Sequence, residues 1–244
     1  METARLLLNR SVIVRLLGVG ALLLVLAGIG VQLSRYLLGR DHLLGLLSLD
    51  SEANIPTFFS ALLLTIAALL LAVIAALAAQ MKKPDRSKWA ILSVGFLIMA
   101  VDETASIHER FIHPIRELLG NESLGVFYYA WIIPGILLVL ALGLFFLGFV
   151  WRLPATTRST IILAATLYLA GAIGIEMIGG VYDETYGDAN LTYAMIAAVE
   201  EGLEMAGLIV FLYALLGYMA DTYDEVALRF VRKDARGESR TGSP

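Results

Sequence analysis

The sequence predicts an all-α, polytopic membrane protein: a six-transmembrane-helix bundle with both termini cytoplasmic. Three observations predict it. Of the 244 residues, 59% are hydrophobic and only 16% are charged, and the mean hydropathy is +0.78, which is outside the range of soluble globular domains. Six apolar stretches have about the 20 residues that are needed to cross a hydrocarbon core of about 30 Å. The basic residues are distributed unevenly between the loops.

The six stretches occupy most of the chain and can be justified in order. Pro56 fits the first turn of the second stretch, with Asn54 as its cap, because proline lacks the N–H that a first turn cannot use. Aromatic residues at 128, 129, 131 and 151 lie at the two ends of the fourth stretch, as interfacial belts do. The predicted spans are about 12–33, 57–81, 89–109, 126–151, 159–180 and 191–219, within a transmembrane domain over 1–220. Residues 221–244 are predicted to be a cytoplasmic tail, partly disordered.

The basic residues orient the predicted spans. With both termini on one side, 14 Lys and Arg residues lie on that side and 4 on the other, so the positive-inside rule makes the terminal side cytoplasmic. Arginine outnumbers lysine in a chain rich in Ala, Leu and Gly, which favours a bacterial cytoplasmic membrane. The expected partners are membrane lipids. No nucleic acid is expected, and a homo-oligomer is left open.

Two absences exclude particular chemistries. The chain has no cysteine, which excludes disulfides, thiolate catalysis and Fe–S ligation. No predicted span contains lysine, which excludes a retinal-type Schiff base within the membrane.

The third predicted span carries an unusual number of ionisable residues. A charged side chain near the bilayer centre costs about 3 to 10 kcal/mol or more, so such residues normally mark a site. On one continuous helix, Asp102, Ser106, Glu109 and His113 share a narrow stripe, because successive residues turn by about 100°. Glu103 and His108 would point away from this stripe. We expect Glu103 to form an ion network with Arg110, and we expect His108 to lie at the membrane interface without a functional role.

The last two predicted spans add four more carboxyl groups. Glu200 and Glu204 share a face by their four-residue spacing, and Glu201 lies about a quarter-turn away. Glu176 lies among glycines near the outer end of the fifth span. The cytoplasmic halves of these spans are nearly free of polar side chains, which favours a cavity that opens outward over a route through the membrane.

The acids need either protons or a cation, because no Lys or Arg lies deep in a span. Carboxylate and imidazole ligands suit a divalent transition metal such as Zn, Fe or Mn. The predicted ligands are Asp102, Glu109, His113, Glu176, Glu200 and Glu204, and the predicted catalytic residues are Ser106, Glu109 and Glu201. No Glu-x-x-His motif occurs, and "HERFIH" is one residue longer than the zinc-protease motif.

These observations favour a metal-dependent enzyme of the hydrolase type that acts on a lipid or another amphiphile from an outward-facing cavity. One alternative is a proton- or cation-coupled transporter, in which the same acids titrate. Another is a non-catalytic membrane scaffold or sensor, in which protonated glutamates bond neighbouring helices.

Overall fold

The computed structural model describes residues 9–40, 44–51, 53–120, 123–223 and 226, and the regular secondary structure of this part of the chain is all helical, without strands. Five of its helices are long and apolar enough to span a membrane, and a bent helix pair brings the number to six if that pair is one span. The elements in chain order are α1 (Arg10–Leu38), α2 (Leu44–Leu47), α3 (Ile55–Gln80), α4 (Arg86–Ala105), η1 (His108–Phe111), α5 (Ile112–Leu118), η2 (Gly125–Phe127), α6 (Ile132–Arg152), α7 (Ala155–Leu169), η3 (Ala170–Ile175), α8 (Glu176–Tyr186) and α9 (Leu191–Thr222).

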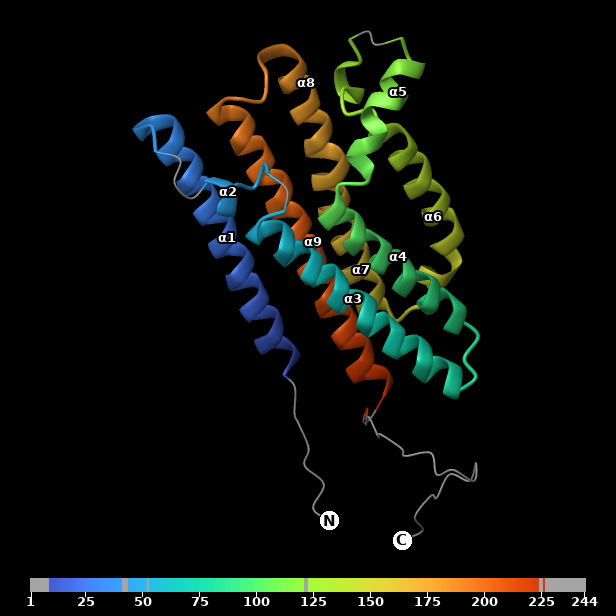
Figure 1. Ribbon diagram of the computed structural model, residues 1–244. Coiled ribbons are helices and arrows are strands. Elements are labelled where there is room, and N and C mark those ends of the chain that lie inside the picture. The colour runs from blue at the N-terminus through green and yellow to red at the C-terminus, as the bar shows by residue number, and fades with distance from the viewer. Residues whose placement is uncertain (1–8, 41–43, 52, 121–122, 224–225, 227–244) are drawn as a thin grey trace, which may run out of the picture.

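The long helices form a bundle with two distinguishable ends. α1 begins and α9 finishes at the same end, the lower one in Figure 1, which we call the termini end. The opposite end, which carries α5 and the α8–α9 connection, is called the far end. α9 lies against α1, α3 and α7, and its side chains make up a large part of the buried apolar core.

Asparagine side chains begin three of the long helices. Asn9, Asn54 and Asn190 cap α1, α3 and α9, each accepting a hydrogen bond from a backbone N–H of the first turn. Pro56 lies in the first turn of α3, as the sequence predicts.

The third span is broken, and the prediction of a continuous helix to His113 is wrong. α4 stops at Ala105, Ser106 adopts a left-handed conformation with φ of 45°, and the following η1–α5 segment is bent by 76° from α4. A helix cannot continue through a left-handed residue. The side chains after Ser106 therefore do not follow the stripe that the periodicity predicts.

The segment after α2 packs deep against α1. A β-carbon on residue 28 would lie 2.7 Å from Leu49 Cγ, so this close contact is possible only because Gly28 has no side chain. Buried Gln32 donates a hydrogen bond to Ser48 Oγ over 3.0 Å. Gly28 is ten residues before the end of α1, so this segment lies about 15 Å below that end, at 1.5 Å per residue.

Glycines let α9 approach α7 and η3 closely. A β-carbon on Gly207 would lie 2.7 Å from Tyr168 N, and one on Gly171 would lie 2.8 Å from Glu200 O. Close backbone approach at small residues is typical of membrane helix packing. η3 has π-helical hydrogen bonding. This kind of helix is rare in proteins, and where it occurs it often lies at a functional site. These contacts place the acidic residues of α9 beside η3 and the start of α8.

Candidate functional site

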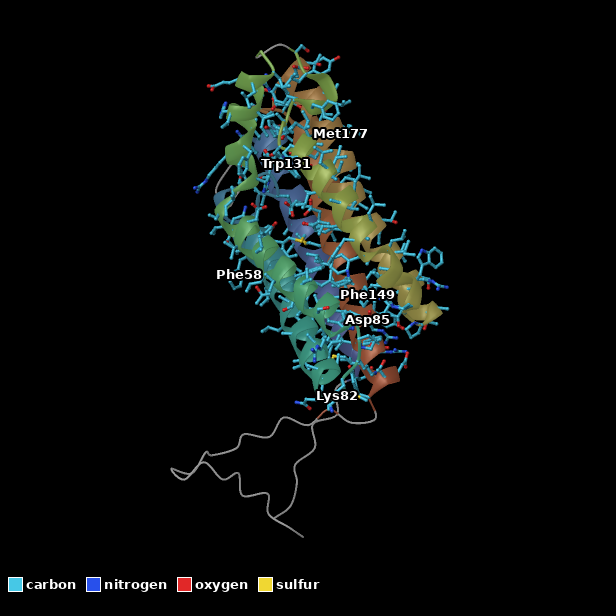
Figure 2. The ribbon with its side chains drawn as sticks, turned by 90° about the vertical axis from the view of Figure 1, so that its right-hand side faces the viewer. Phe58, Lys82, Asp85, Trp131, Phe149 and Met177 are labelled. Atoms are coloured by element: carbon cyan, nitrogen blue, oxygen red, sulfur yellow. The ribbon has the colours of Figure 1, made fainter. Side chains whose placement is uncertain are left out.

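A cavity of about 1010 Å³ lies between α4, α6, α7 and α9, with η1 at its far end. Along α6 its lining runs from Trp131 to Val150, and Figure 2 shows Trp131 and Phe149 at well-separated levels of the bundle. Nineteen residues of helix correspond to about 28 Å. The cavity therefore follows most of the length of α6.

The two ends of the cavity differ in chemistry. Eight acidic residues line it, together with His108, and none of the described lining residues is Lys or Arg. Toward the termini end the lining is apolar, with Leu92, Phe96, Leu142, Phe146 and Ile161 among its members. The acids among the lining residues are Asp50, Asp102, Glu103, Glu109, Glu176, Glu200, Glu201 and Glu204.

Asp102 and His108 form a pair at the break of the third span. Asp102 Oδ2 lies 2.8 Å from His108 Nδ1, and Asp102 Oδ1 accepts a hydrogen bond of 2.9 Å from the backbone N–H of His108. Because the carboxylate holds Nδ1, the other ring nitrogen, Nε2, is the one that can contact a ligand. The left-handed turn at Ser106 brings the two residues together.

Trp131 connects this pair to the glutamates. Its ring centroid lies 4.7 Å from that of His108, and its Nε1 donates a hydrogen bond of 3.1 Å to Glu176 Oε1. The Glu176 and Glu200 carboxyl groups also lie close enough together to interact. Two neighbouring carboxyl groups repel each other when both are charged, and no described residue of the cavity lining is Lys or Arg, so sharing a proton between them would be favourable.

A second acidic group lies beside the first. The Tyr168 hydroxyl and the Glu204 carboxyl group are neighbours, and Glu103 and Glu201 are close enough to both residues to act on them electrostatically. These side chains come from α4, α7 and α9, so the cavity gathers carboxyl groups from helices that are distant in sequence.

Hydrogen bonds toward the far end connect three segments beside the cavity. The Tyr129 hydroxyl donates to Asp183 Oδ2 over 2.8 Å and lies 2.7 Å from the Tyr193 hydroxyl. Burial, reinforced by these bonds, raises the pKa of Tyr129 well above its usual range, so the hydroxyl stays protonated. Asp50 also lines the cavity, where burial of its carboxyl group and repulsion by Asp188 and Asp183 raise its pKa to about 6.

The structure brings together most, but not all, of the predicted site residues. Asp102, Glu176, Glu200, Glu201 and Glu204 all line the large cavity. Ser106 and His113 line a separate outer pocket of about 590 Å³, and Glu109 borders both. Ser106 and His113 are displaced because the helix that would have aligned them with Asp102 is broken.

The predicted metal ligands do not assemble as a metal site. Within the described residues, no group of three or more His, Asp or Glu side chains is placed so that it could hold a metal ion. Asp102 pairs with His108, while Glu176 accepts a hydrogen bond from Trp131 and lies near Glu200. Binding of a transition metal by the predicted ligands therefore stays a prediction.

Sequence reasoning missed His108, Trp131, Tyr168 and Glu103 as members of the site, all of which line the cavity. No glycine or proline marks the break at Ser106, so a helical projection continues through it. The only local signal is the run "DETASIHER", where Thr104 and Ser106 are weak helix formers among five ionisable residues.

The fold and the site define an all-helical bundle with five or six candidate membrane spans and an acid-lined cavity inside it. The model of a family described as "Domain of unknown function (DUF8692)" matches residues 16–218, and the chain belongs to this family. No match was found among curated proteins or among solved structures.

Proposed function

We propose that this protein is a membrane-embedded hydrolase that cleaves an ester or amide bond in an amphiphile. The observation that carries the proposal is the Asp102–His108 pair at the acidic end of a cavity whose other end is apolar. An amphiphile fits such a cavity with its head group near the pair and its chain toward the termini end.

His108 is the proposed general base. Asp102 holds Nδ1, which orients the imidazole and stabilises its charged form, as the carboxylate of a catalytic triad does. Nε2 then takes a proton from a water molecule as its oxygen attacks the carbonyl carbon. General base catalysis of this kind contributes about 10²- to 10⁴-fold in rate.

The Glu176–Glu200 pair is the proposed proton donor. As the bond from the carbonyl carbon to the leaving oxygen or nitrogen breaks, the pair gives its proton to the leaving group and recovers one from His108. Water thus supplies a hydroxyl to the acyl product and a hydrogen to the leaving group. Trp131 contacts His108 and Glu176, and so holds base and donor near one another.

The test is hydrolysis of long-chain esters and amides by the purified protein in vesicles, followed by mass spectrometry of the products. His108→Gln is expected to lower the rate at least about 10²-fold. His113→Gln is the matched control, because His113 lines the separate outer pocket, and it should keep the wild-type rate. Equal loss in both variants, or loss in neither, would contradict the role of His108.

Metal content, measured on the same preparations without chelator, separates this proposal from the metal-dependent enzyme that the sequence favours. The present proposal predicts hydrolysis without a stoichiometric transition metal. If the wild-type protein holds one or two equivalents of metal, and Glu200→Gln loses both metal and activity, the glutamates bind metal and do not act as a proton donor.

A proton-coupled carrier is the second candidate, because the cavity extends from Asp50 in the far half of the bundle to Val150 near the termini end. The sequence predicts no polar route through the half of the bundle near the termini end, yet the cavity continues into that half with an apolar lining. Flux of an amphiphile in proteoliposomes, abolished by Glu204→Gln and retained in Glu117→Gln, would favour the carrier. Glu117 lies on α5 and is exposed.

A further inference from the structure

α6 is attached to the rest of the bundle at its two ends. At the termini end, Arg152 forms a salt bridge of 2.5 Å with Asp85, and the Trp89 and Phe149 rings make an edge contact with centroids 4.8 Å apart. At the far end, Trp131 bonds Glu176. Between these attachments, the cavity separates the middle of α6 from α4 and α9.

Some side chains in this middle section both line the cavity and are exposed on the outside of the bundle. Ile98 on α4 is 63% exposed and Leu138 on α6 is 60% exposed, and both contribute to the cavity wall. Leu142, one turn along α6 from Leu138, shares both properties. Such high exposed fractions on side chains that also line the cavity fit a place where the cavity meets the outer surface, and the α4 and α6 backbones are not closely packed against each other.

This opening lies along the side of the bundle. Ile98 and Leu138 are well inside their helices, seven residues from the end of α4 and six from the start of α6. Figure 2 turns this side of the molecule, with α4 and α6, toward the viewer. The residues around the opening are aliphatic, so the medium that faces them is hydrocarbon.

We propose that the opening bordered by Ile98, Leu138 and Leu142 is a lateral portal through which a bilayer-resident amphiphile reaches the cavity. This inference rests on the proposed function and specifies its substrate as a molecule dissolved in the membrane. The alkyl chain passes between α4 and α6 without leaving hydrocarbon, and the head group meets the carboxyl groups near Trp131.

Because the chain has no cysteine, single cysteines allow the portal to be blocked at one chosen position. Leu138→Cys and Ile98→Cys place a thiol at the portal. Leu137→Cys and Leu97→Cys are matched controls, since these neighbouring side chains are 64% and 52% exposed but are not part of the cavity wall. Each variant is alkylated in vesicles with a bulky membrane-soluble maleimide.

Uptake is followed with a single-chain amphiphile that carries bromine next to its head group and quenches Trp131 fluorescence. The chain has three tryptophans, so the quenching seen in the wild-type protein but not in Trp131→Phe is the part that reports arrival of the amphiphile at Trp131. Alkylation at positions 138 or 98 is expected to slow arrival at least tenfold, and alkylation at 137 or 97 to leave it unchanged.

Equal rates in all four alkylated variants would overturn the portal, because the amphiphile would then reach Trp131 from the far end. The portal would also be overturned if alkylation at 137 slowed arrival as much as alkylation at 138. If the probe never quenches Trp131 in the wild-type protein, the proposed amphiphile site itself fails. The two failures are therefore distinguishable.

Discussion

The packing of α9 against α7 predicts that the substitution Gly207→Ala destabilises the protein. A β-carbon at position 207 would lie 2.7 Å from Tyr168 N and 2.9 Å from Ala164 O, both of which belong to the α7 backbone. Ordinary contact begins at 3.4 Å, so the two helices must separate by about 0.7 Å. Such overpacking costs about 1–3 kcal/mol in unfolding free energy.

The matched control is Gly95→Ala, because a β-carbon on Gly95 of α4 meets nothing within 4 Å. Both substitutions bring the same gain in helix propensity, about 0.5–1 kcal/mol. The difference between the two variants therefore isolates the packing cost of about 1–3 kcal/mol. Reversible unfolding in mixed micelles, followed by circular dichroism, measures both. Equal stability of the two variants would refute the close approach of α7 and α9.

Three further predictions concern the cavity. Asp102→Asn removes the charge that orients His108, so the rate of hydrolysis should fall about 10²-fold or more. Amphiphile binding, followed by quenching of Trp131 fluorescence, should stay unchanged. Equal loss of hydrolysis and binding would assign Asp102 to binding alone. The acidic lining without Lys or Arg predicts that a cationic single-chain amphiphile binds at least about tenfold, or about 1.4 kcal/mol, more tightly than an anionic one of equal length. Asp50 has a pKa raised from 3.8 to about 6, so the folded state holds its proton more tightly and stability falls as pH rises from about 4 to about 6. Asp50→Asn should flatten this decrease, which is small because the side chain is partly exposed and solvent screens its charge. Thermal unfolding of both proteins at pH 4 and pH 7 measures it. An unchanged slope in the variant would assign the titration to another group.

The hydrophobic runs predicted the helical fold well, because spans of about 20 apolar residues have no soluble alternative. Local signals also predicted the cap at Asn54 and the first turn at Pro56, since these depend on residues that are adjacent in sequence. The prediction of six spans holds only if the bent pair is counted as one span, and the structure gives no orientation in a membrane.

The site was predicted in part. Glu200, Glu201 and Glu204 lie on one uninterrupted helix, so their spacing predicted a shared environment correctly. The shared stripe of Asp102, Ser106, Glu109 and His113 was predicted wrongly, because the left-handed residue at Ser106 ends the helix and redirects the chain that follows it. A left-handed residue other than glycine leaves little trace in the sequence. The role of Trp131 depends on contacts with His108 and Glu176, which only the tertiary structure brings together.

Photolabelling of the cavity tests the central claim most directly. A long-chain amphiphile with a diazirine next to its head group is added to vesicles that contain the protein, irradiated, and the labelled residues are mapped by mass spectrometry. We predict labels on Trp131 and on α9 between Ala197 and Glu204, all competed away by unlabelled amphiphile. Labels confined to outward residues such as Leu137 and Leu144, without competition, would contradict an amphiphile site inside the bundle.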